Sequence, residues 1–394
     1  MEFSRIRKWH KFLKVWRKVR LLMKKVMSWP RRYIKRLDSY IIRKFIGTYI
    51  YSIALIISIS IVFDVNENLA KFTTNHAPLR AIVMDYYVNF VPYFANLFSP
   101  LFVFIAVIFF TSKLAGNSEI IAMLACGMSF KRLLRPYLIS AAIIAVLNFY
   151  LGSYIIPKGN IVRHNFESLY KNNKKVTSAS NVQLQVAPGV IAFMSQYDDV
   201  TRTGYGFTLD KFENKKLVST LSANVIQYDT ISDSHYQWKV RNYKIRTLTG
   251  MREKITSGQE LDTLIQMEPM DLVFSKGQQE TLTSPELRRY ISKQQERGSQ
   301  NVVQYEVEYH KRIASSFASF ILTIIGASLS SRKRKGGMGL YLGIGLALSF
   351  TYILLQTIST TFATQAGTPP MLAAWIPNLL FIFVAYFWYR KAPN

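Results

Sequence analysis

The histidines, the cysteine and the acidic residues are the side chains whose spacing could support catalysis or metal binding. Among the five histidines, the tightest pairing with an acid is His164 with Glu167, three residues apart. Zinc takes three or four such ligands, and the sequence offers this pair no third. Cys126 is the only cysteine, which excludes an internal disulfide and a cysteine-based zinc site. We therefore predict no catalytic residue and no metal.

The sequence motifs of ATPases, zinc proteases and serine hydrolases are missing as well. The chain contains no Gly-x-x-x-x-Gly-Lys, no His-Glu-x-x-His and no Gly-x-Ser-x-Gly. We expect the chain to bind no cofactor of its own. Any ATP with its magnesium would be bound and hydrolysed by another protein.

A segment near residues 117–127 has the composition of a short helix between two apolar runs. Ser118 could cap its start, Glu119 suits the positive end of the helix dipole, and Gly127 could end it after about two turns. Such a helix could fit a cleft on a separate ATPase, with Glu119 facing an arginine there. From these residues alone, an ordinary turn packed on the membrane is the alternative.

The elements that must position this segment are long apolar stretches. Apolar residues make up 49% of the 394 residues, although 50 are Lys or Arg. Both values are compatible because charge and hydrophobicity occupy different stretches, as in membrane proteins. Six stretches are long enough to cross a bilayer as helices, near 45–63, 90–110, 136–156, 313–331, 338–362 and 371–389.

Lys and Arg in the short loops predict the orientation of these spans. Positive flanks stay in the cytoplasm, and the basic flanks are the N-terminal arm, the 111–135 loop, the loop after Ser331 and the tail at Arg390. Both termini are therefore predicted to be cytoplasmic in a multi-pass inner-membrane protein. Residues 64–89, 157–312 and 363–370 would lie outside.

The net charge of +27 does not indicate nucleic-acid binding, because of where the charge lies. Residues 1–44 hold 16 Lys or Arg and two acids, directly before the first apolar span. Residues 1–35 are expected to form a basic amphipathic extension on anionic lipid head groups. A later start of the protein, at Met23 or Met27, is the alternative.

A polar, turn-rich stretch between the third and fourth spans shows period-two alternation from about 182 to 267. Several short strands with turns between them predict an all-β sandwich or jelly roll. The inward-facing residues that we select are Val182, Leu184, Phe193, Phe207 and Trp238.

Four motifs resemble the LptF/LptG (YjgP/YjgQ) permease family, whose members export lipopolysaccharide, and the resemblance leans towards LptG. They are Leu37-Asp38-Ser39-Tyr40-Ile41, the segment from Asn117 to Gly127, Pro157-Lys158-Gly159 and Gly367-Thr368-Pro369-Pro370. The resemblance implies six transmembrane helices, with an extracytoplasmic jelly roll between helices 3 and 4. It also implies that the five selected inward residues line the lumen of this jelly roll. It also implies that the 117–127 helix couples to an ATPase, through the residues Ser118, Glu119, Ile120, Met123 and Gly127.

The resemblance further implies that spans 1 and 5 line a lateral gate. Family members similar to LptG carry a lysine near the outer end of span 1, where Asp64 stands here. Since an acid repels phosphate, Lys71 or Arg80 could supply the contact, or the head group could differ. Asp64 marking only the membrane boundary is the alternative. Gly339 and Gly343 in span 5 allow close helix approach, either to a second subunit or within the chain.

The sequence thus predicts a basic extension (1–35), spans 1 to 3 (36–156), a periplasmic β domain with linking helices (157–312), and spans 4 to 6 with a short tail (313–394). The family resemblance implies a permease subunit of an ABC-type transporter that extracts lipopolysaccharide or a similar large amphiphile. Implied partners are a homologous permease, an LptB-like ATPase dimer and an LptC/LptA-like jelly-roll protein. The alternatives are a membrane-embedded lipid- or polymer-modifying enzyme and a structural envelope scaffold.

Overall fold

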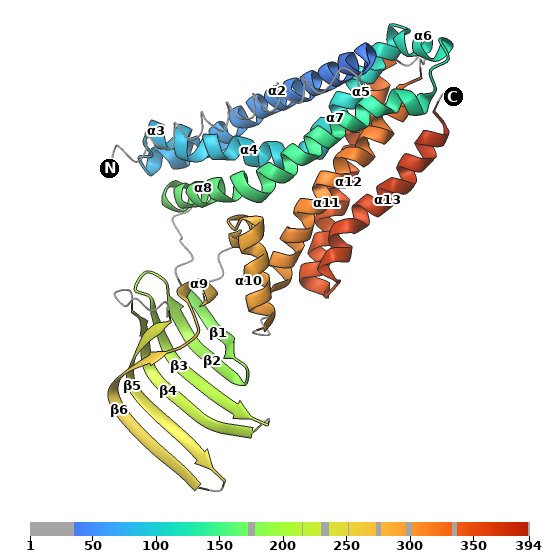
Figure 1. Ribbon diagram of the computed structural model, residues 1–394. Helices are drawn as coiled ribbons and strands as arrows, with labels where there is room; N and C mark the ends of the chain where they lie inside the picture. The colour runs from blue at the N-terminus through green and yellow to red at the C-terminus, as the bar shows by residue number, and fades with distance from the viewer. Residues whose placement is uncertain are drawn as a thin grey trace.

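The computed structural model describes residues 35–171, 178–214, 216–229, 236–250, 252–272, 277–296, 302–332 and 337–392. Its two parts are a helix bundle and a curved β-sheet, joined by short helices (Figure 1). Apart from Lys35, the predicted amphipathic extension lies outside the described residues.

Six helical stretches of the described chain are long and apolar enough to cross a membrane, which confirms the predicted number. They contain α2 (Arg36–Thr74), α5 (Ser99–Gly116), α7 (Phe130–Tyr150), α11 (Val302–Ser330), α12 (Gly337–Ala366) and α13 (Pro370–Arg390). The third continues from α7 through η2 (Leu151–Ile155) into α8 (Ile156–Tyr170). With 39 residues α2 is about 58 Å long, so it extends well beyond a hydrocarbon core of roughly 30 Å.

The second predicted span, 90–110, is divided between two helices. After α3 (Leu79–Ala81) and η1 (Ile82–Tyr87), α4 (Val88–Leu97) ends just before Phe98, and α5 begins at Ser99. Pro100 lacks the N–H that would continue the α4 hydrogen-bond ladder to Asn96, and it is well placed in the first turn of a new helix.

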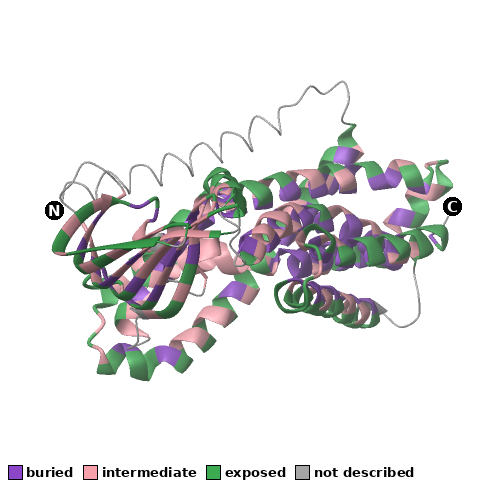
Figure 2. Cartoon of the chain, turned by 90° about the horizontal axis from the view of Figure 1, so that it is seen from below, coloured by how far each residue is buried: buried purple, intermediate pink, exposed green. Residues whose placement is uncertain are grey.

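Burial separates inner from outer helices of the bundle. In the most apolar stretch of each helix, 78% of residues are buried in α5 and 72% in α11, against 22% in α2 and 28% in α12. Figure 2 shows the same contrast, with exposed residues along the outer helices. Because α2 and α12 bury so little within this chain, most of their apolar surface is left for lipid or for another protein.

The β-sheet is one antiparallel meander in which every strand pairs with its neighbour in sequence. Its strands are β1 (Ser178–Ala187), β2 (Val190–Asp198), β3 (Thr203–Glu213), β4 (Lys216–Tyr228), β5 (Gln237–Thr249) and β6 (Arg252–Leu264). The predicted β domain is confirmed, and its strands are antiparallel. The crossing connections of a jelly roll are not found among the described strands, because short links join each strand to the next.

One face of the sheet carries an apolar row across five strands. Leu184 pairs with Ala192, Ala192 with Leu209, Leu209 with Leu221, and Leu221 with Ile245. Side chains that alternate along each strand align in such a row and bury one another. All five belong to, or pack against, one hydrophobic core.

Three short helices lead from the sheet back to the bundle. They are α9 (Pro269–Leu272), η3 (Gln278–Glu280) and α10 (Ser284–Glu296), after which α11 enters the bundle. As predicted for a start with proline in the first turn, α10 begins at Ser284-Pro285. At the opposite end of the bundle, α6 (Glu119–Ala125) connects α5 to α7 (Figure 1).

Candidate functional site

The predicted short helix is present as α6, and its two ends are formed differently. Ser118 stands at the N-cap position but has a left-handed backbone (φ 60°), and its side chain makes no capping hydrogen bond. The backbone closes the turn instead, since the Ala122 N–H donates to the Ser118 carbonyl at 2.9 Å. Gly127 ends the helix as predicted, because its φ of 80° suits glycine and its N–H donates to the Leu124 carbonyl.

The two sides of α6 have different surroundings. Ile120 is fully buried in the bundle core, and Met123 packs against the same core. On the other side, Ile121, Ala122 and Ala125 are exposed. The helix is therefore anchored through one face and presents a small apolar face outward.

Glu119 is held by a residue from the start of α2. Its carboxylate accepts hydrogen bonds from the Tyr40 hydroxyl at 3.2 Å and from the Asn117 side-chain amide at 3.2 Å. Tyr40 and Glu119 are 79 residues apart in the chain. Two motifs that the sequence places far apart, 37–41 and 117–127, thus meet at one end of the bundle.

An ion pair next to this contact holds α2 against α7. The Arg132 guanidinium donates to both carboxylate oxygens of Asp38, at 2.8 and 2.6 Å. The Asp38 side chain is 5% exposed, and the same carboxylate accepts from the Lys35 N–H at 3.0 Å at the start of α2. Bidentate geometry makes this one of the stronger kinds of side-chain pair. We call Asp38, Tyr40, Glu119 and Arg132 the α6 junction.

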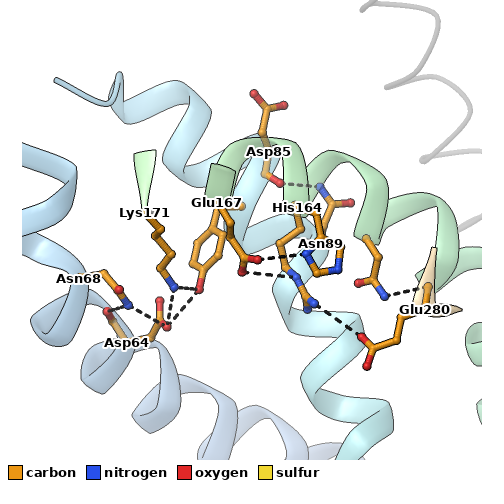
Figure 3. Close-up of polar contacts among 11 residues, drawn as sticks. Asp64, Asn68, Asp85, Asn89, His164, Glu167, Lys171 and Glu280 are labelled. Carbon is orange, nitrogen blue, oxygen red and sulfur yellow. Dashed lines mark hydrogen bonds and ion pairs between the residues drawn. The ribbon is translucent and has the colours of Figure 1, made fainter. Parts of the chain in front are cut away.

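Asp64, near the other end of the apolar part of α2, lies in a cluster of polar side chains (Figure 3). It accepts from the hydroxyls of Tyr86 at 3.1 Å and Tyr87 at 3.0 Å, and from the Asn68 amide at 3.1 Å. The Lys171 ammonium lies 3.5 Å from the same carboxylate. We call these five residues the Asp64 cluster.

The two tyrosines of the cluster are fixed in their protonated form. Burial, followed by the charge and hydrogen bond of Asp64, raises the pKa of Tyr86 well above its ordinary value, and the same causes raise that of Tyr87. Both hydroxyls therefore remain donors to Asp64 at neutral pH. Through these two phenols and the ammonium, Asp64 joins α2 to η1 and to the end of α8.

The cation beside Asp64 is neither Lys71 nor Arg80, the two residues that the sequence suggested as contacts to a lipid phosphate. Lys71 and Arg80 are exposed and form no ion pair within the described residues. Lys171, directly after α8, takes that place, and its ammonium also lies 4.3 Å from the centre of the Tyr86 ring. No sequence signal indicated Lys171, because 107 residues separate it from Asp64.

A second polar group on α8 extends the cluster towards η3 (Figure 3). His164 lies 3.2 Å from Glu167, as their spacing suggested, and Arg163 reaches Glu167 at 3.6 Å and Glu280 at 4.0 Å. Burial and the nearby charge of Glu308 raise the pKa of Glu280. Within the described residues no three metal-ligating side chains gather, so the group is an ion-pair network.

The glycines of α12 divide into two kinds. A methyl group added at Gly339 or Gly343 would meet nothing within 4 Å, whereas one at Gly345 would collide with Ile108 and Phe104 of α5. Close packing within the chain therefore explains Gly345. Gly339 and Gly343 instead open onto the exposed face of α12, where the described chain offers no neighbour.

The sheet brings together four of the five predicted lumen residues. Leu184, Phe207 and Trp238 are buried in its core, and Val182 packs against it. The Trp238 indole N–H also donates to the Met267 carbonyl at 2.9 Å, so the segment after β6 covers this residue.

The prediction for Phe193 is wrong. Its neighbours Ala192 and Met194 are buried in the sheet core, so Phe193 points to the opposite face, where it pairs with Gln183 and Thr208. The run Val190-Ile191-Ala192-Phe193-Met194 is apolar throughout. Period-two alternation therefore could not fix which of its residues face inward.

Comparison with known proteins gives a family match over most of the chain. Residues 39–391 match the family described as lipopolysaccharide export system permease LptF/LptG. A relative is the lipopolysaccharide export system permease protein LptG of Haemophilus influenzae. It is 21% identical over 358 residues, which cover 90% of this chain and 98% of that protein.

Proposed function

The chain belongs to the LptF/LptG family of lipopolysaccharide export permeases, and from this premise we propose that it is one permease subunit of an ABC-type transporter. A homologous permease would complete the conduit, and a two-copy ATPase would supply the energy. The substrate would be lipopolysaccharide or a similar large amphiphile. The end of the bundle with α6 would face the cytoplasm, and the β-sheet would lie in the periplasm.

The observation that carries this proposal is the α6 junction. Ile120 anchors the inner face of this short helix in the bundle core, and the exposed face is small and apolar. A partner that binds the exposed face could therefore move the helix as a rigid unit. Glu119 joins it to α2 through Tyr40, so movement of α6 would be passed to α2. An arginine of the ATPase could compete with Tyr40 for the partly exposed Glu119 carboxylate.

The gate would lie along α2 and α12, the two spans with the least burial inside this chain. Gly339 and Gly343 would allow a helix of the homologous subunit to approach α12 closely. On α2, Lys171 beside Asp64 would provide the positive charge for a lipid phosphate, in place of a lysine on α2 itself. A phosphate arriving there would have to compete with Asp64 for the ammonium.

The apolar face of the sheet would shelter acyl chains on the way to an LptC/LptA-like partner. A photo-reactive residue at Val182 or Leu184 should then capture the lipid during transport. Phe193 is the matched control, because it lies on the opposite face of the same sheet. Equal capture at Phe193 and Leu184 would contradict a conduit along the apolar face.

Purification under mild conditions tests the assembly. We expect wild-type protein to co-purify with a homologous permease and an ATPase, whereas a Glu119→Lys variant should lose most of the ATPase. Charge reversal at Glu260→Lys is the control, since this exposed residue lies on β6. A chain that purifies alone would overturn the proposal, and unchanged ATPase yield with Glu119→Lys would remove α6 from the coupling path.

A further inference from the structure

A groove of about 670 Å³ lies between α10, the end of α7 with η2, and the beginning of the apolar part of α11. None of the residues lining it comes from α2 or α12, so it is separate from the gate suggested above. Its volume is in the range of roughly 300 to 1,000 Å³ that is typical of small-ligand sites. The family assignment does not explain this groove.

One wall of the groove is cationic. Arg288, Arg289 and Lys293 line it from α10, on the face opposite the fully buried Leu287. Lys293 already has an ion-pair partner in Glu268 at 3.2 Å. Both arginines are exposed and form no ion pair within the described residues, although the acid Glu296 lines the same wall two turns further along. Two adjacent guanidinium groups are thus left to bind an anion.

The facing wall is apolar and lies where the spans end. Phe149 and Tyr154 come from the end of the third span and are 40% and 42% exposed, and Ile313 begins the apolar part of α11. Tyrosine is typical of the boundary between hydrocarbon and head groups. A ligand in this groove would meet guanidinium groups on one side and an aromatic and aliphatic surface on the other.

We propose that this groove binds the phosphate head group of a resident membrane phospholipid. Guanidinium groups bind phosphate oxygens bidentately. The acyl chains would leave along Phe149 and Ile313 towards the bilayer. The site goes beyond the proposed transport function, because it holds a lipid that is not exported, on a face that α2 and α12 do not form.

Native mass spectrometry of the intact protein, in the assembly in which it purifies, tests the site with phosphatidylglycerol as the probe. The double variant Arg288→Gln/Arg289→Gln should bind it at least about tenfold more weakly, the loss expected for about 1.4 kcal/mol of phosphate contact. Arg252→Gln/Lys254→Gln is the control, because it removes the same charge at exposed positions of β6. Equal affinity in the two double variants would overturn the site.

Two further results separate the sources of phosphate. A photo-reactive residue at Tyr154 should capture phospholipid, and capture of lipopolysaccharide instead, or of no lipid, would overturn the proposal. Inorganic phosphate should compete poorly; if it displaces phosphatidylglycerol at equal concentration, the groove recognises an anion and not a lipid. Should the double variant fail to fold, the single variants Arg288→Gln and Arg289→Gln provide the same readout.

Discussion

The α6 junction and the Asp64 cluster both hold α2 through an acid that pairs with a distant cation, but they hold it differently. Asp38 has a bidentate partner in Arg132 at 2.6 and 2.8 Å. Asp64 instead divides its oxygens among two phenols, an amide and an ammonium 3.5 Å away. The planar bidentate pair fixes the geometry at Asp38, so this attachment of α2 is rigid. The several donors at Asp64 can exchange with one another, so that attachment is adjustable.

The largest effect is expected at the rigid attachment. Asp38→Ala should destabilise the fold by roughly 3 kcal/mol, the low end for breaking a buried pair, because Arg132 keeps 23% of its side chain exposed. Reversible unfolding in mixed micelles measures this. Asp38→Ala/Arg132→Ala should recover part of the loss. If the double variant loses as much free energy of unfolding as Asp38→Ala and Arg132→Ala lose together, the two side chains are not coupled. The attachment at Asp38 would then not be the rigid one.

A smaller effect is expected when the adjustable attachment is cut. Asp64→Ala should cost about 2 kcal/mol, because the two tyrosine hydroxyls lose their acceptor. Asp64→Asn should cost less than about 1 kcal/mol, since its amide oxygen can still accept one of these bonds. The same unfolding measurement applies. An Asn variant as unstable as Ala would show that the charge, rather than the exchangeable donors, holds this end.

The smallest effect is a pH dependence at the same end. Because the pKa of Glu280 is raised by burial and Glu308, protonation of this group stabilises the fold at low pH, and the contribution is lost as pH rises through the raised pKa. Glu280→Gln should therefore flatten the part of the pH profile that lies above the ordinary pKa of glutamate.

Glu286 supplies a control of opposite sign for that measurement. Hydrogen bonds from the side chain and backbone of Thr283 lower its pKa. Its contribution to stability is present at neutral pH and is lost as pH falls through the lowered pKa. Glu286→Gln should thus remove stability mainly at neutral pH. If both variants shift the profile in the same direction, the environment assigned to Glu280 is wrong.

What could be predicted from the sequence depends on whether a local pattern decides the feature. The six apolar helices, the end of α6 at Gly127 and the start of α10 follow from length, glycine and proline, so they could be read directly. Phe193 was assigned to the wrong face of the sheet, because an unbroken apolar run does not show which of its alternating side chains face the core.

The ion pairs could not be predicted, because their partners are 94 and 107 residues apart. Asp64 has no opposite charge at helical spacing, and the one that Asp38 has, Lys35, is not the residue that forms the bidentate pair with it. A single sequence gives no distance between such positions. Asp64 illustrates the point, since its residue type suggested repulsion of phosphate, while the fold places Lys171 beside it.

The uninterrupted length of α2 gives these two attachments a mechanical meaning. Asp38 and Asp64 are 26 residues apart on one helix, about 39 Å along its axis. Tilting this rod by about 5° around its Asp38 pivot displaces Asp64 sideways by about 3 Å, comparable to the length of one hydrogen bond. Because α2 is held rigidly at Asp38 and adjustably at Asp64, it would act as a lever. A small rotation of α6 would then be amplified along α2 into an exchange of hydrogen-bond partners at Asp64.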